Sequence, residues 1–254
     1  IQVQEACMLP LRDNIPHRYK PIGVGIIIGL NTLFFLYEMG LSRVDLARLF
    51  HLLGVVPARF FHPDWAEWMG YPAGGLISFV THMFLHSGWL HFLANMWILW
   101  IFADNVEDTM GTLKFLIFYL LCGLGALFVH LLFNIDSSVP VLGASGAIAG
   151  VMGAYFVLYP HAKVLTFLPI IFIPYLIELP AVLFLGVWFL IQVFSGLFSS
   201  VASQSGGGVA WWAHAGGFVA GLLLLPLFKD DKRCYYCYDR SKLDSDEYND
   251  FFFF

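Results

Sequence analysis

The chain has 254 residues, of which 59% are hydrophobic and 12% are charged. A soluble domain of average composition is about half apolar and about a quarter charged, so this composition predicts an integral membrane protein in contact with the lipid bilayer. The formal net charge of −5 comes mostly from the C-terminal tail and gives no indication of nucleic-acid binding.

Runs of about twenty apolar residues, long enough to cross a bilayer, divide the chain into regions. Residues 1–20 lack a short apolar core, so we expect a cytoplasmic N-terminal segment without a cleavable signal peptide. The predicted apolar runs are residues 22–39, 76–103, 113–133, 145–159, 180–198 and 209–228. Between them we expect a long first loop with short interfacial helices (41–75), a Pro-punctuated connection (164–179) and a flexible Ser- and Gly-rich loop (199–208).

The fourth run is too short to cross a bilayer by itself. A helix that begins inside the membrane needs an aqueous cavity above it, because its free backbone N–H groups cannot face lipid. The sequence therefore predicts an all-α membrane protein with six spans over residues 21–228, in which the fourth helix is short and begins within the membrane.

The distribution of cations predicts the orientation. Of the 13 Lys and Arg residues, ten lie before the first run, at the connections that follow the second and fourth runs, or in the tail. The other three are Arg43, Arg48 and Arg59 in the first loop. The positive-inside rule then places both termini in the cytoplasm and the start of the fourth run near the outer side. The expected location is a bacterial inner membrane.

Ser145 opens the fourth run between small residues. A hydroxyl at a helix start lies near free N–H groups and the positive end of the helix dipole, which favours a developing negative charge. The alternative interpretation is a patch of small residues that lets two membrane helices approach closely.

Polar side chains in other apolar runs could take part in a reaction with Ser145. His91 and Asn95 are four residues apart and share a helix face, His86 lies just upstream, and His214 stands among small residues in the sixth run. A lone membrane histidine is often only a hydrogen bond between helices. Together with Ser145, however, these residues are what acyl transfer needs, namely a nucleophile, a base and donors for an oxyanion.

These motifs resemble those of the rhomboid intramembrane serine proteases. The likeness extends from the first run to Phe228, and its motifs fall on the second, fourth and sixth runs. The motifs are His86 with His91-Phe92-Leu93-Ala94-Asn95, then Gly143-Ala144-Ser145-Gly146, and finally Ala213-His214-Ala215-Gly216-Gly217.

The resemblance implies a role for each residue. Ser145 would be the nucleophile and His214 its general base, while His91, Asn95 and the Ser145 N–H would form the oxyanion hole. The supporting residues would be His86 at the cavity mouth, Gly143 and Gly146 beside the serine, Gly217 and Gly221 on the sixth helix, and Glu107 and Gly111 at a turn between spans. Trp188, Phe189 and Gln192 of the fifth span would line a lateral gate for the substrate.

The implied activity is hydrolysis of a peptide bond in or near a transmembrane segment of another membrane protein, with no cofactor or metal. The resemblance predicts no particular oligomeric state. One departure is the first loop, which offers Trp65 and Trp68 without the adjacent arginine of many relatives.

Residues 229–254 form a cytoplasmic tail that we expect to be disordered, with an acidic stretch over 239–250. Cys234 and Cys237 are spaced as in some metal or redox sites, but a closed zinc site wants four ligands. In a reducing cytoplasm we expect inert thiols.

Each alternative function would be expected to show its own sequence pattern. A membrane metalloprotease would show His-Glu-x-x-His on a helix, and an intramembrane aspartyl protease would show two aspartates deep within spans, and this sequence has neither pattern. A small transporter would be expected to show an internal repeat, and we find none between the halves. A catalytically silent rhomboid-like protein that binds membrane helices remains the alternative.

Overall fold

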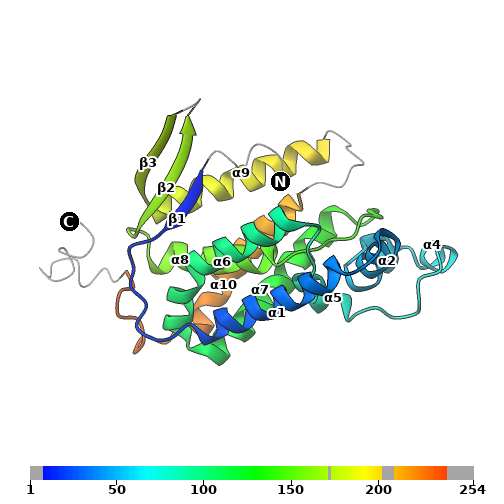
Figure 1. Cartoon of the computed structure of the whole chain (residues 1–254), viewed down its shortest axis with the longest axis horizontal. Coiled ribbons are helices and arrows are strands. Elements are labelled where there is room, and N and C mark those ends of the chain that lie inside the picture. The colour runs from blue at the N-terminus through cyan, green and yellow to red at the C-terminus, as the bar shows by residue number, and fades with distance from the viewer. Residues whose placement is uncertain (1–7, 171–172, 202–208, 239–254) are drawn as a thin grey trace, which may run out of the picture.

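The computed structural model describes residues 8–170, 173–201 and 209–238. Apolar runs form helices because a backbone in hydrocarbon must satisfy its N–H and C=O groups within itself. The helices are α1 (Ile22–Met39), α2 (Arg43–Leu53), α3 (Pro57–Phe61), α4 (Pro63–Trp68), α5 (Ser78–Thr81), α6 (Trp89–Met110), α7 (Thr112–Phe133), α8 (Ser145–Leu158), α9 (Ala181–Val201) and α10 (Trp211–Phe228). Strands β1 (Leu9–Arg12), β2 (Lys163–Ile170) and β3 (Ile173–Pro180) lie together at one end of the molecule (Figure 1).

Four of the described helices, α1, α7, α9 and α10, are long and apolar enough to cross a membrane. Their bounds agree with the first, third, fifth and sixth predicted runs to within a few residues. The short fourth run is confirmed as α8, which has 14 residues. The remaining long helix, α6, carries Asp104, Glu107 and Asp108 near its end and is not among the four.

The second predicted run, residues 76–103, does not form one helix. The chain makes α5, a 3₁₀ turn over His82–Phe84 and an irregular connection before α6 begins at Trp89. Glu38, buried near the end of α1, accepts the backbone N–H of His86 at 3.2 Å from each carboxylate oxygen. This bond holds the connection between α5 and α6 against α1.

Glu107 joins α6 to the start of α1. Its two carboxylate oxygens accept the backbone N–H groups of Gly23 at 2.8 Å and Val24 at 2.9 Å, and the Thr112 hydroxyl donates to it at 2.6 Å. The first N–H groups of a helix have no partner within the helix, so a carboxylate there satisfies them and complements the helix dipole. Gly111 turns the chain between α6 and α7 with φ at +79°. These bonds explain why α6 continues well beyond its predicted end.

Residues 164–179, predicted as a connection, form most of a β-hairpin. β2 pairs antiparallel with β3, and β1 from the N-terminal segment pairs with the other edge of β2. Proline lacks the N–H that a helix interior needs, and the β-branched and aromatic residues between the prolines suit strands. The all-α prediction is therefore corrected to a predominantly helical fold with one small sheet.

The first ten residues of the tail pack on the helices instead of being disordered. Arg233 donates through Nε to a carbonyl of α6 at 2.8 Å, and the backbone N–H of Tyr238 donates to the last carbonyl of α8 at 2.7 Å. Cys234 and Cys237 form a disulfide, so the expectation of free thiols is wrong for this pair. The acidic stretch over 239–250 and most of the loop over 199–208 lie outside the described residues.

A buried arginine organises the first loop in place of a Trp-Arg pair. Arg59, which is 7% exposed, donates to the carbonyls of Leu52 at 3.4 Å and Pro72 at 3.1 Å. Its guanidinium also lies 5.1 Å from the centre of the Tyr71 ring. Hydrogen bonds to two separated carbonyls fix the path of the chain between α2 and α5.

Helices α8 and α10 pack closely against each other. A Cβ added at Gly217 would lie 2.0 Å from the carbonyl oxygen of Gly146, and one added at Gly221 would lie 1.9 Å from that of Gly150. Such distances leave no room for any side chain, so the two backbones touch. Small residues at a helix interface allow this approach, which membrane helices use because lipid gives them no hydrophobic drive to associate.

Asp13 follows β1 and lies against α8, where it accepts a hydrogen bond from the Tyr155 hydroxyl. Burial raises the pKa of the Asp13 carboxyl from its ordinary 3.8 to about 7, although the hydrogen bond opposes the shift. The folded protein therefore favours the protonated form of this group.

We predict that Asp13→Asn removes one component of the pH dependence of stability. Below about pH 4 the Asp13 carboxyl is mostly protonated in both the folded and the unfolded protein. Between about pH 4 and about pH 7 it ionises in the unfolded protein but stays largely protonated in the folded one. The free energy of unfolding of the parent therefore falls as the pH rises through this range. The melting temperature of the variant minus that of the parent, measured in detergent, should rise over this window and then level off. A difference that stays flat from pH 4 to pH 8 would contradict the assignment.

Candidate active site

Ser145 is the first residue of α8, and the loop before it is fixed by backbone contacts. The N–H of Gly143 donates to the carbonyl of His82 at 2.8 Å, and Val141 pairs with Val55 of the first loop as an isolated bridge. Gly143 has φ at +114°, a conformation that side chains rarely adopt. The serine hydroxyl is therefore presented by a constrained turn at a helix start, where backbone N–H groups are free.

His214 lies in the first turn of α10 and faces Ser145. Its Nε2 is 2.8 Å from the Ser145 Oγ, and its side chain is almost completely enclosed, since the residue is 7% exposed. The close α8–α10 contact, which begins at Gly146 and Gly217 within one turn of these two residues, explains this distance because it brings the starts of both helices together. A histidine at hydrogen-bond distance from a serine can act as its general base.

His91 and Asn95 of α6 lie on the other side of the serine loop. A Cβ added at Gly143 would lie 2.6 Å from His91 Nε2 and 3.8 Å from Asn95 Nδ2, so both side chains approach the residue two before the serine. The Ser87 backbone nitrogen lies 3.4 Å from His91 Nδ1, and the Ser87 Oγ lies 3.1 Å from the same nitrogen. If Nδ1 accepts both hydrogens, a neutral His91 carries its proton on Nε2, the nitrogen that faces the loop.

His86 lies behind His91 and does not itself reach the serine in the described contacts. Its ring is 1% exposed and packs against His91, with ring centres 5.1 Å apart, and against Phe35 and Phe92. The Glu38 carboxylate holds its backbone, as described above. Sequence reasoning missed Glu38, although a carboxylate within an apolar run is a signal of function or of a buried contact.

The three residues predicted to line a gate pack between α9 and α10. The Phe189 ring stacks on Phe218 with centres 4.7 Å apart, and the Trp188 ring lies 5.9 Å from that of His214. Gln192 is 1% exposed, and its Oε1 lies 2.8 Å from His214 Nδ1. Gln192 thus contacts the site directly, which its assignment to a gate did not anticipate.

The remaining predicted residues lie in two places, at the interface of α8 with α10 and at the turn between α6 and α7. Gly146, Gly217 and Gly221 form the α8–α10 contact, whereas Glu107 and Gly111 stand at the α6–α7 turn, away from the serine. Within residues 8–170, 173–201 and 209–238, no three His, Cys, Asp or Glu side chains gather as a metal site would require.

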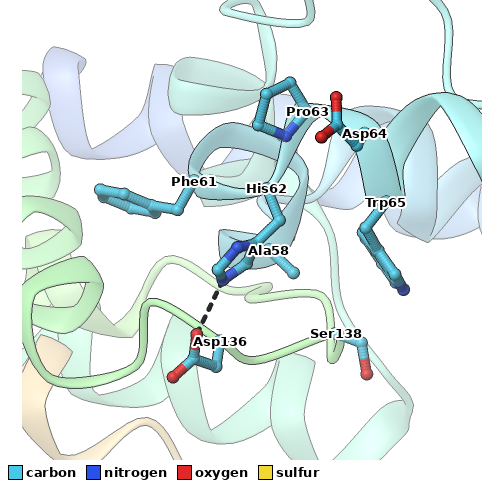
Figure 2. A pocket seen from close by; sticks show the side chains of 8 residues that line it. All are labelled: Ala58, Phe61, His62, Pro63, Asp64, Trp65, Asp136 and Ser138. Atoms are coloured by element: carbon cyan, nitrogen blue, oxygen red, sulfur yellow. Dashed lines mark hydrogen bonds and ion pairs between the residues drawn. The ribbon is translucent and has the colours of Figure 1, made fainter.

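A separate cavity of about 560 Å³ lies under the first loop (Figure 2). His62 and Asp136 close one side of it with a contact of 2.7 Å, which ties the loop to the α7–α8 connection. Trp65 lines another side. The lining includes none of the predicted site residues, so this hollow is not the catalytic cavity expected above Ser145.

Comparison with known proteins gives consistent results. Residues 73–230 match the rhomboid domain family. The chain is 31% identical over 157 residues, 58% of its length, to "Rhomboid protein 1, mitochondrial" of Saccharomyces cerevisiae, covering 40% of that protein. It is 29% identical over 147 residues to "Presenilin-associated rhomboid-like protein, mitochondrial" of Homo sapiens, which is 55% of this chain and 34% of the relative.

A third relative is "Rhomboid-like protein 11, chloroplastic" of Arabidopsis thaliana, 30% identical over 122 residues, 47% of this chain and 39% of the relative. The chain thus spans 40% or less of the length of each of these relatives. Their names place them in mitochondria or chloroplasts, which does not support the expectation of a bacterial inner membrane.

We predict that Gly221→Ala destabilises the protein by about 1 to 3 kcal/mol, because the added methyl would force α10 away from α8. Gly29→Ala in α1 is the matched control, since an added Cβ there meets nothing within 4 Å among the described residues, and alanine favours a helix. Thermal unfolding in detergent measures both. Equal melting temperatures for the parent and Gly221→Ala would show that the helices are not in backbone contact.

Proposed function

The chain belongs to the rhomboid family, and on that premise we propose that it is an intramembrane serine endopeptidase that cleaves transmembrane segments of other membrane proteins. The observation that carries this proposal is the 2.8 Å approach of His214 Nε2 to Ser145 Oγ, at the start of a helix. The two residues come from helices far apart in the chain, and their meeting depends on the glycine contact between α8 and α10.

In the proposed reaction, Ser145 Oγ attacks the carbonyl carbon of the scissile peptide bond while His214 Nε2 takes the hydroxyl proton. The tetrahedral intermediate collapses, the C–N bond breaks, and His214 returns the proton to the leaving amine. Water then attacks the acyl carbon while His214 Nε2 takes its proton. The bond from the acyl carbon to Ser145 Oγ breaks, and His214 returns the proton to Oγ as the carboxylic acid product leaves. Each step uses groups that the chain itself supplies, together with one water molecule.

The oxyanion of each intermediate would lie among three donors, namely the Ser145 N–H, His91 Nε2–H and Asn95 Nδ2. The position of both α6 side chains against Gly143 supports this assignment. Donors fixed before the reaction stabilise the developing charge without reorganising, and the loss of one such donor costs about 10²- to 10³-fold in rate in other hydrolases. Small substrate side chains next to the scissile bond fit the narrow space between these groups.

We further propose six membrane-spanning elements over residues 21–228, with α6 and α8 as the second and fourth. The cationic N-terminal segment, the sheet and the ordered tail lie at one end of the molecule, and α2 and α4 of the first loop lie at the other (Figure 1). This separation supports the expected orientation, with residues 1–20 and 229–254 on one side of the membrane. The relatives named above are mitochondrial or chloroplastic by name, so an organelle membrane is the proposed location.

Substrate helices would reach Ser145 beside α9, where Trp188 and Phe189 separate the site from the lipid. The alternative function is a catalytically silent protein that binds membrane helices in the same fold. The hydrogen bond between Ser145 and His214 favours the protease, because a binding function has no need of a base beside a serine.

We predict that the purified chain cleaves a single-span substrate in detergent, and that Ser145→Ala and His214→Ala each lower the rate by at least about 10³-fold. The reason is that neither nucleophile nor base works alone. Unchanged melting temperatures would establish that both variants fold. If the parent fails to cleave several substrates but binds them, the helix-binding alternative replaces the protease.

A further inference from the structure

His214 makes a hydrogen bond through each ring nitrogen, and only one of them involves the serine. Nε2 lies 2.8 Å from Ser145 Oγ, and Nδ1 lies 2.8 Å from Oε1 of Gln192 in α9. We propose that Gln192 is a positioning residue, whose Oε1 accepts the Nδ1–H and holds His214 in the tautomer that can take a proton from Ser145. The catalytic part of this inference rests on the proposed function, whereas the tautomer itself does not.

The tautomer follows from the inventory of donors. A neutral imidazole carries one hydrogen, and Nε2 must be bare to accept the hydroxyl hydrogen of Ser145. The hydrogen is then on Nδ1, which needs an acceptor because the site is buried. The Gln192 carbonyl oxygen is that acceptor. If the Gln192 NH₂ group faced the ring instead, Nδ1 would have to accept its hydrogen and so carry no proton. The ring proton would then be on Nε2, which could not take a proton from the serine.

The packing around the ring limits the other positions that it could take. The Trp188 ring, one turn before Gln192 on α9, lies 5.9 Å from the His214 ring and tilted by 32°. The Trp211 ring lies 6.5 Å away and nearly perpendicular. The indoles therefore bound the imidazole, while the Gln192 hydrogen bond fixes its rotation and its proton.

A simpler role for Gln192 is a polar tie between two membrane helices. Such ties usually satisfy both ends of an amide, yet in the described structure Gln192 Nε2 is buried and has no hydrogen-bond partner. A buried donor without a partner is unfavourable, so a tie between helices does not by itself account for this side chain. The two roles differ in what they predict for the proton on His214.

A variant of similar length tests this directly. Gln192→Met keeps the volume and removes the acceptor, and Gln192→Glu keeps an acceptor but adds a charge. Asn31→Leu in α1 is the matched control, because Asn31 is also a fully buried amide with one hydrogen bond, to the Ile27 carbonyl at 2.8 Å, and one unpartnered atom. It lies outside the site.

The first measurement is nitrogen NMR of the full chain with ¹⁵N-labelled histidine, in detergent, with the His214 signals identified by their loss in His214→Ala. We expect a protonated Nδ1 and a bare Nε2 in the parent at a pH where the ring is neutral, and in Asn31→Leu as well. Gln192→Met should populate the opposite tautomer. A bare Nδ1 in the parent, or an unchanged tautomer in Gln192→Met, would overturn the proposal whether or not the protein cleaves anything.

The second measurement is the pH profile of cleavage. Gln192→Met should lower kcat by about 10-fold, the factor that one hydrogen bond corresponds to, with KM changed by less than about 3-fold. Gln192→Glu should move the acidic limb of the kcat profile to higher pH, since a carboxylate beside Nδ1 favours the charged ring. If Gln192 only tied two helices together, the Gln192 variants would have lower melting temperatures and the same pH profile of kcat as the parent. An inactive parent would instead reject the proposed function and leave the NMR result to decide on Gln192.

Discussion

The direct contact of the α8 and α10 backbones is the constraint on which the site depends. Where Gly217 faces Gly146 and Gly221 faces Gly150, even a methyl group would collide with a carbonyl oxygen. Ser145 begins one of these helices and His214 lies in the first turn of the other, so the distance between their side chains is set by how closely the helices pack. The hydrogen bond of 2.8 Å between them therefore depends on glycines that lie from one residue to two turns further along the two helices.

The opposite end of the molecule supplies the ties that hold the surrounding helices in place. Glu107 caps α1 and spans the turn to α7, and the backbone N–H groups of Arg18 and Tyr19 bond to the Asp108 carboxylate. The N-terminal segment and the tail thus hold α1 and α6 together at the end of the molecule where the carboxylates of Glu107 and Asp108 accept hydrogen bonds.

Much of the helical organisation was predictable because hydrocarbon length and apolar composition fix where a span can begin and end. The start of α8 at Ser145 was also predicted correctly, because the apolar run begins at this residue. The strand β1 was not predicted, since it pairs with residues about 150 positions away, which no local pattern reveals. The pairing of β2 with β3 is local, but the prolines in this stretch led to its interpretation as a connection. The ordered tail likewise depends on contacts with α6 and α8. Gln192 carried a signal, as an amide within an apolar run, but its partner could be found only once α9 and α10 were placed side by side.

The central claim is that Ser145 is a nucleophile activated by His214, and covalent labelling with a fluorophosphonate tests it without knowledge of a substrate. The reagent reacts only with an activated serine, and peptide mapping by mass spectrometry locates the adduct. The account predicts an adduct on Ser145 in the parent and a strong loss of labelling in folded His214→Ala. A folded parent that stays unlabelled at Ser145, or a His214→Ala variant that labels at the parent rate, would contradict it.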